Sequence, residues 1–228
     1  MVHADWISQI PEAKQQLRAA TAATIRDQCV SAIIRTDTRE KAESAMNAAV
    51  RGGFTLVEFT MTTPGALDLI HEFSKREGIL AGAGTVMSVS AAEEAIAAGA
   101  SFIVSPIFDP AVVIAAGTRG AITIPGASTP TEMETAYRGG ADLVKVFPAP
   151  AGGVGFIEAV RGPMPYLPLF PTAGVDAENF TDFLDAGCVG AGFVKSLFVP
   201  ADLEDGNYEA IEGRALRITQ RLAAWKGR

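Results

Sequence analysis

A lysine and a glutamate stand inside apolar segments of the chain, where a charged side chain is unusual. Lys145 lies in the segment 143–148 (LVKVFP), and Glu58 lies in the segment 56–60 (LVEFT). Desolvation disfavours an ammonium ion, lowers the pKa of the lysine and leaves a neutral amine that can attack a carbonyl carbon. A glutamate beside that amine could transfer protons. The alternative is structural: a lysine that reaches solvent, or a buried ion pair of Glu58 with Lys145 or Arg35.

Further polar side chains occur where the apolar segments end. They are Arg35, Thr60, Thr62, Thr85, Ser105, the turn 172–174 (TAG), and Lys195 with Ser196. In a barrel of parallel strands, such strand ends carry the reactive groups. The turn 172–174 and the pair at 195–196 follow the last two apolar segments, where barrels often bind phosphate through backbone N–H groups. Two ordinary turns are the alternative.

Motifs for common cofactors and metals are incomplete in this sequence. The segment 82–85 (GAGT) lacks the third glycine of a dinucleotide fingerprint, and Val194 stands where a P-loop needs glycine. Of the two histidines only His71 lies in an amphipathic segment, and Cys29 and Cys188 form no CxxC motif. We therefore expect no cofactor, no metal site, and two reduced thiols in a reducing compartment.

Charge and hydropathy exclude two classes of partner. The 228 residues carry a formal net charge of −7, whereas a nucleic-acid backbone requires a basic face. One small anion can still bind in a local pocket. No apolar run reaches the roughly 18 residues of a membrane helix, and the N-terminal residues lack the profile of a signal peptide. We expect a cytoplasmic protein that binds neither nucleic acid nor membranes.

Short β-branched segments alternate with alanine-rich helical segments along the whole chain. The predicted strands are 29–34, 55–59, 79–82, 101–105, 121–124, 142–146, 167–170 and 188–193. Helices are expected to begin at Asp37, Ser90 and Thr129, because each is followed three residues later by a glutamate that can complete a capping box. Glycines such as Gly99 and Gly140 are expected to end helices in the left-handed conformation.

These elements predict a closed parallel sheet covered by helices. Strands that are apolar on both faces and alternate with helices are typical of buried parallel sheets. We therefore expect a (β/α)8 TIM barrel, with an extra N-terminal helix near 10–27 and a C-terminal helix near 208–224. An open doubly wound sheet is the alternative. No linker interrupts the pattern, so residues 1–228 are predicted to form a single domain.

Seven segments at these strand ends resemble the family of 2-keto-3-deoxy-6-phosphogluconate (KDPG) and 2-keto-4-hydroxyglutarate (KHG) aldolases. They are 52–64 (GGFTLVEFTMTTP), 82–86 (GAGTV), 102–106 (FIVSP), 124–129 (IPGAST), 144–149 (VKVFPA), 171–175 (PTAGV) and 196–200 (SLFVP). They occur in the family's order and at matching spacing, so the resemblance extends over most of the chain. It implies a class I aldolase that needs no metal and, by analogy, forms a homotrimer.

The resemblance also implies roles for individual residues. Lys145 matches the Schiff-base lysine, and Glu58 matches the general acid/base. Thr85 matches a residue that contacts the pyruvyl part of the substrate, and Phe147 packs beside it. The remaining matches, at the phosphate-binding corner, are Thr172, Ala173, Gly174 and Ser196.

Three positions depart from the family pattern. Thr62 stands where some members carry an arginine that binds the substrate carboxylate, and Arg35 could supply that charge instead. Ala173 replaces the first glycine of the phosphate turn and narrows the approach to the backbone. Lys195 replaces a glycine before Ser196, where it either adds charge to the phosphate site or obstructs it.

The expected reaction is cleavage of KDPG to pyruvate and glyceraldehyde 3-phosphate through an imine at Lys145. The alternatives with the same chemistry are cleavage of KHG, cleavage of the galactonate epimer of KDPG, and decarboxylation of oxaloacetate. An isomerase or a non-catalytic barrel that binds phosphate is the alternative of another class. Such a binder would not need both Lys145 and Glu58.

Overall fold

A computed structural model of the chain describes residues 5–148 and 152–228. Ala149, the last residue of the segment 144–149, and residues 1–4, which begin the N-terminal segment, lie outside the described residues. Within these ranges, no helix is long and apolar enough to cross a membrane.

All strand pairs between the named strands are parallel, and the strands form two sheets. The larger sheet has the order β5-β4-β3-β2-β1-β9, and the smaller one has the order β6-β7-β8. Their bounds are β1 Val30–Ile34, β2 Leu56–Thr60, β3 Leu80–Gly84, β4 Phe102–Val104, β5 Ile122–Ile124, β6 Gly126–Ala127, β7 Val144–Val146, β8 Leu169–Pro171 and β9 Ala191–Phe193. Each predicted strand segment therefore overlaps a strand, and β2, β3 and β8 extend past the ends of the predicted segments.

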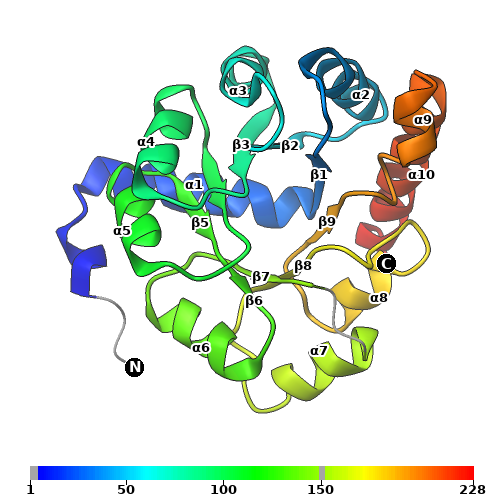
Figure 1. Cartoon of the computed structure of the whole chain (residues 1–228). Coiled ribbons are helices and arrows are strands. Elements are labelled where there is room, and N and C mark those ends of the chain that lie inside the picture. The colour runs from blue at the N-terminus through cyan, green and yellow to red at the C-terminus, as the bar shows by residue number, and fades with distance from the viewer. Residues whose placement is uncertain (1–4, 149–151) are drawn as a thin grey trace.

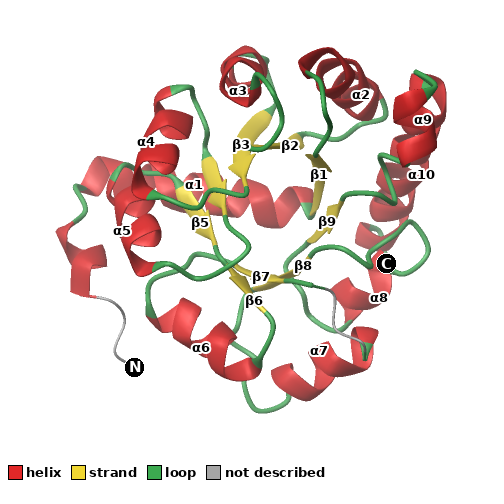
Figure 2. Ribbon diagram, viewed as in Figure 1, coloured by secondary structure: helices red, strands yellow, loops and turns green. Residues whose placement is uncertain are grey.

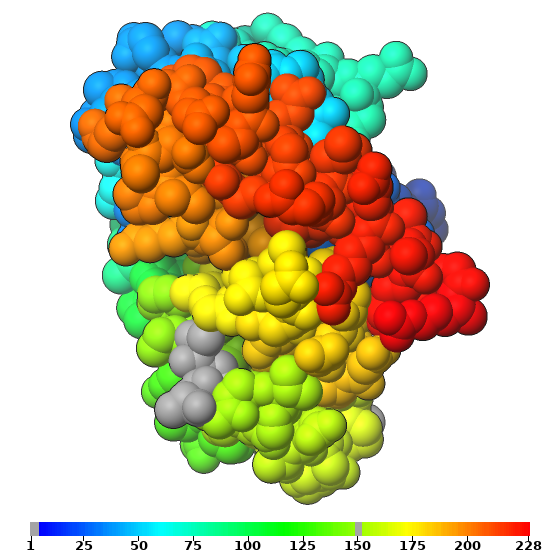
Figure 3. Space-filling view, turned by 90° about the vertical axis from the view of Figure 1, so that its right-hand side faces the viewer, coloured from blue at the N-terminus to red at the C-terminus, as the bar shows by residue number. Residues whose placement is uncertain are grey.

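Helices surround the strands (Figure 1). They are α1 Glu12–Gln28, α2 Arg39–Arg51, α3 Ala66–Ser74, α4 Val89–Ala97, α5 Pro110–Thr118, α6 Pro130–Arg138, α7 Gly153–Arg161, α8 Phe180–Asp185, α9 Pro200–Glu204 and α10 Tyr208–Lys226, preceded by a 3-10 helix η1 at Asp5–Gln9. Figure 2 shows strands in the middle and helices outside them, which differs from the two-sided cover of a doubly wound sheet. Figure 3 shows α9 and α10, in orange and red, along one side of the molecule, where α10 packs against α2.

The strand predicted at 121–124 differs from the expectation. It continues past Pro125 as a second short strand, so β5 pairs with β4 whereas β6 pairs with β7. Proline has no N–H to donate to a strand ladder, which explains the interruption at this residue. The result is a curled six-stranded sheet and a three-stranded sheet in place of one uninterrupted eight-stranded sheet. A single isolated bridge, between Thr172 and Gly192, links the end of β8 to β9.

Helix starts follow the capping chemistry, with two shifts in position. Thr129 forms the predicted capping box with Glu132 at the start of α6. Helix α2 is capped by Thr38 rather than Asp37, because the Thr38 hydroxyl accepts a hydrogen bond from the Lys41 N–H. The predicted start of α4 at Ser90 is wrong. The helix is capped two residues earlier, by Ser88, whose hydroxyl accepts a hydrogen bond from the Ala91 N–H.

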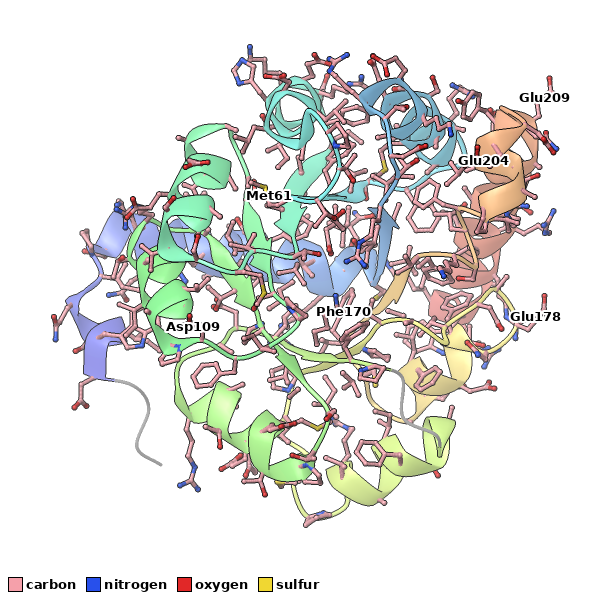
Figure 4. All side chains as sticks on the ribbon, in the orientation of Figure 1. Met61, Asp109, Phe170, Glu178, Glu204 and Glu209 are labelled. Atoms are coloured by element: carbon pink, nitrogen blue, oxygen red, sulfur yellow. The ribbon has the colours of Figure 1, made fainter. Side chains whose placement is uncertain are left out.

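A cluster of buried apolar side chains fills the space between the strands. It contains Ile25, Leu56, Phe102, Val104, Ile122, Ile124, Leu143 and Phe170. Figure 4 labels Phe170, whose side chain lies in the middle of the space that the strands surround. Ile25 is only 1% exposed. It belongs to α1, which crosses one end of the strands (Figure 1). Helix α1 therefore packs across the strands at the end opposite their carboxyl termini.

A buried ion pair fixes α1 in this position. Arg18 Nη2 donates to both carboxylate oxygens of Asp142, at 2.9 and 2.8 Å. The backbone N–H and the hydroxyl of Thr123 donate to Asp142 Oδ2 at 2.9 and 3.1 Å. These bonds connect α1, β5 and the segment before β7 through one carboxylate.

We predict that Asp142→Ala destabilises the fold by about 3 kcal/mol, because it leaves the buried Arg18 guanidinium without its partner. Urea denaturation measures the change. The control is Arg138→Ala, which removes an exposed ion pair with Glu134 and should cost less than about 1 kcal/mol. Equal effects of the two substitutions would contradict this role of Asp142.

Candidate functional site

A cavity of about 470 Å³ lies at the carboxyl ends of the strands. It brings together nearly all of the side chains singled out in the sequence. Those that line it are Arg35, Glu58, Thr60, Thr85, Lys145, Phe147, Thr172, Ala173, Gly174, Lys195 and Ser196. Thr62 is exposed and does not line the cavity, and its hydroxyl lies 3.1 Å from that of Thr60.

Lys145 is buried in β7, with 8% of its surface exposed. Its Nζ lies 4.9 Å from the centre of the Phe147 ring. Burial lowers the pKa of Lys145 below that of an ordinary lysine; the Glu58 charge opposes this shift and the Arg35 charge adds to it. The environment thus favours the neutral amine that nucleophilic attack requires.

Glu58 is buried in β2 and is 2% exposed. Burial raises the pKa of Glu58, against the opposing charges of Lys145 and Arg35. No salt bridge among the described residues joins Glu58 to Lys145, and Glu58 Oε1 has no hydrogen-bond partner there. The two groups interact through their charges across the same cavity, in contrast to the direct ion pair of the structural alternative.

Gly84 of β3 makes the room that the Glu58 carboxylate occupies. A Cβ atom at Gly84 would lie 1.9 Å from Glu58 Oε1, far inside van der Waals contact. The carboxylate therefore rests directly against the backbone of the neighbouring strand.

Arg35 and Thr85 form one wall of the cavity. Arg35 Nη2 donates to the Thr85 hydroxyl at 2.9 Å. Thr85 has a φ of 58°, a left-handed conformation that is uncommon and strained for a β-branched residue. Arg35 is exposed and lines the cavity, so a cation is present at the end of β1, whereas Thr62 lies outside the cavity.

The turn after β8 forms the opposite corner. Ala173 and Gly174 both adopt left-handed φ values, 65° and 77°. The Ser196 hydroxyl donates to the Val175 carbonyl at 2.6 Å, which connects the β9 end to this turn. Lys195 is exposed on the rim. Because Ala173 adopts a left-handed φ, glycine would be the unstrained residue at this position.

Several lining residues were not singled out as site residues from the sequence. They include Ile33, Pro106, Asp176 and Val194. Ile33 and Val194 lie two residues from Arg35 and Ser196, so strand alternation was an available signal. Asp176 gave no such signal: its Oδ1 accepts from the Glu178 and Asn179 N–H groups at 2.9 Å each, and it shapes the turn before α8.

The described residues give little support for metal binding or for thiol chemistry. Among residues 5–148 and 152–228, no three His, Cys, Asp or Glu side chains are grouped to hold a metal. Cys29 and Cys188 are free and buried, as expected. Burial raises the pKa of Cys188 to about 12, which keeps its thiol protonated and unreactive.

A family model described as KDPG and KHG aldolase matches residues 21–213 of the chain. The chain belongs to this family. An aldolase of this family is a lyase, and the resemblance noted in the seven sequence segments is thereby confirmed. The match includes both Lys145 and Glu58 and every other residue that lines the cavity.

Individual relatives agree with this assignment. The chain is 37% identical over 194 residues to the KHG/KDPG aldolase of Escherichia coli (strain K12), covering 78% of this chain and 88% of that one. It is 36% identical over 172 residues to a probable 2-dehydro-3-deoxy-6-phosphogalactonate aldolase of Rhizobium meliloti, covering 74% and 81%.

Solved structures of aldolases share the fold. The structure of a KDPG aldolase from Legionella pneumophila, with pyruvate captured as a covalent carbinolamine, superposes with a TM-score of 0.77 at 26% identity, covering 86% of this chain and 97% of that one. A structure named native KDPGal gives a TM-score of 0.78 at 28% identity, covering 87% and 96%.

The contact between Gly84 and Glu58 leads to a prediction about activity. Gly84→Ala should displace the Glu58 carboxylate. This should lower kcat of the aldol cleavage by on the order of 10²-fold or more, the effect expected when an acid–base group is lost. Pyruvate release measures the change, and the melting temperature shows whether the fold is retained. The control is Gly155→Ala, since a Cβ at Gly155 meets nothing within 4 Å. Full activity of Gly84→Ala would contradict the prediction.

Proposed function

We propose that the protein cleaves KDPG to pyruvate and glyceraldehyde 3-phosphate through a Schiff base at Lys145. The observation that carries the proposal is the amine itself. It is desolvated in β7 and faces the same cavity as a buried carboxylate and an exposed arginine. This combination suits imine chemistry on a small 2-keto acid better than binding alone, which needs neither group buried.

The residues account for each step of the proposed mechanism. The neutral amine of Lys145 adds to the C2 ketone. Protonated Glu58 donates a proton to the C2 hydroxyl, and its loss as water gives a cationic imine that accepts electrons. Glu58 takes the proton of the C4 hydroxyl, the C3–C4 bond breaks, and the aldehyde leaves. The electron pair of that bond forms an enamine, which is protonated at C3. Hydrolysis of the resulting imine releases pyruvate and restores the amine.

The two ends of the cavity suit the two ends of the substrate. Arg35 and Thr85 are proposed to bind the carboxylate, with Phe147 beside the pyruvyl group. The turn 172–174 and Ser196 are proposed to bind the phosphate, with Lys195 as an additional charge. The Ser196 hydroxyl already donates to Val175 O, and the Thr172 N–H donates to Val146 O at 3.1 Å. The N–H groups of Ala173 and Gly174 are therefore the principal phosphate donors proposed here.

The galactonate epimer of KDPG is the second candidate substrate. It is favoured by the names of the Rhizobium relative and of the native KDPGal structure. The E. coli relative is named for both KHG and KDPG. All four candidate substrates can use the same electron sink at C2, so the imine chemistry does not distinguish them. A kinetic comparison of KDPG, its galactonate epimer, KHG and oxaloacetate decides among them.

We further propose that the two sheets form one closed (β/α)8 barrel in a single domain of residues 1–228. The hydrogen bond from Lys145 N to Pro125 O at 2.9 Å and the bridge between Thr172 and Gly192 support closure on both sides of the smaller sheet. We also propose a cytoplasmic homotrimer. The fold of the chain resembles that of a protein cage designed by fusing symmetric oligomeric domains, with a TM-score of 0.77 and 28% identity. The match covers 87% of this chain and 73% of that one.

Borohydride reduction in the presence of pyruvate tests the mechanism. We expect one reduced pyruvyl group per chain, located by peptide mapping on Lys145, because the lowered pKa of this lysine leaves its amine free to react. Lys195→Gly keeps Lys145 and should be labelled like the natural protein. Labelling of Lys195 instead, or no labelling at all, would refute the mechanism.

The role of Lys195 is tested by kinetics of Lys195→Gly. If its ammonium binds the phosphate, KM for KDPG should rise roughly 10- to 100-fold, as expected for one lost charge-assisted contact. KM for oxaloacetate, which carries no phosphate, should stay unchanged. An unchanged or lower KM for KDPG would instead identify Lys195 as an obstruction and favour the unphosphorylated substrates.

A further inference from the structure

A second, much smaller cavity lies inside the barrel next to the catalytic pair. Its volume of about 10 Å³ is enough for a single water molecule. Glu58, Lys145 and Thr172 line both this inner cavity and the larger one. The inner cavity therefore lies behind the two proposed catalytic groups, on the side away from the substrate.

Two of the residues that line the inner cavity each carry a buried oxygen atom without a partner. Ser31 Oγ and Glu58 Oε1 form no hydrogen bond with any described residue, and both residues line this cavity. Ser31 is 4% exposed and lies in β1, beside the strand that carries Glu58. A buried polar atom without a partner costs roughly 1–3 kcal/mol, so two of them around one small space indicate a shared ligand.

The chemistry of the lining suits water. A buried water needs two to four polar partners, and the inner cavity offers Ser31, Glu58, Lys145 and Thr172. Its other walls are apolar side chains such as Leu56, Val104 and Phe170, which exclude any larger polar ligand. The space is too small for more than one molecule.

We propose that one enclosed water occupies this cavity, donates a hydrogen bond to Glu58 Oε1 and is anchored by the Ser31 hydroxyl. Ser31 is then a positioning residue, which acts on the reaction only through Glu58. The inference rests on the proposed role of Glu58 as the acid–base group.

The enclosed water would favour the ionised form of Glu58. A hydrogen bond donated to a carboxylate stabilises its charge and opposes the effect of burial. The charged groups that act on Glu58 are Lys145 from β7 and Arg35 after β1. The side chains that β4 and β5 place in the inner cavity, Phe102, Val104 and Ile124, are uncharged. Loss of the water should therefore make Glu58 hold its proton to a higher pH.

The pH profile of kcat/KM on KDPG tests this inference. In Ser31→Val the hydroxyl is lost and the added methyl groups fill the cavity. We expect the acidic limb of the profile to move upward by about one pH unit, the scale of one hydrogen bond to a charged group. Ser31→Ala, which removes the hydroxyl but leaves the space, should give a smaller shift in the same direction and serves if Ser31→Val does not fold.

Two controls separate positioning from a general loss of stability. Thr123→Val removes another buried hydroxyl of the same barrel, which bonds to Asp142 away from both cavities, and it should leave the acidic limb in place. In a Glu58→Gln background, Ser31→Val should cause no further shift, because no carboxylate remains to respond.

Borohydride trapping of pyruvate distinguishes the two levels of the argument. Trapping at Lys145 in the natural protein and in the Ser31 variants, together with the shifted limb, supports the inference. Normal trapping with an unmoved limb in both Ser31 variants overturns it and leaves the proposed function intact. Absence of trapping in the natural protein refutes the proposed function, and the inference fails with it. A crystal structure that resolves ordered waters gives an independent result, since a dry inner cavity would also overturn the inference.

Discussion

The burial of two opposite charges in an apolar interior is the constraint on which the site depends. Burial in this interior lowers the pKa of Lys145 and raises that of Glu58. The two shifts bring a neutral amine and a proton-holding carboxyl closer to the same pH range. A direct ion pair would oppose both shifts, and the separation of the two side chains avoids it. Reactivity in this fold is therefore a property of the packing around the charges.

The rest of the molecule compensates for that cost in stability. Two charges without full solvation destabilise the folded state, and the fold offsets them with well-satisfied contacts elsewhere. Asp142 accepts bonds from both Arg18 and Thr123, and the apolar cluster around Phe170 fills the space below the site. Glycine at position 84 and the left-handed Thr85 also serve the site at the expense of local stability.

Local chemistry made much of the fold predictable, and long-range geometry limited the rest. Apolar segments located the strands, and Thr129 with Glu132 located the start of α6, because each signal involves residues only a few positions apart. Most lining residues were found because the carboxyl ends of parallel strands meet at one edge. The outward position of Thr62 and the inclusion of Asp176 depend on loop conformations, which residue types alone do not determine. Residue types alone likewise did not determine that α4 is capped by Ser88 and not by Ser90.

The position of α1 has a consequence for the order in which products leave. Ile25 of α1 lines the inner cavity, at the end of the strands opposite the larger cavity. Within the larger cavity Lys145 is buried, whereas Lys195 is exposed. In the proposed binding mode, a phosphorylated fragment near Lys195 would lie between solvent and the fragment attached to Lys145. Departure would then be sequential: the phosphorylated fragment leaves first, and the fragment bound to Lys145 follows.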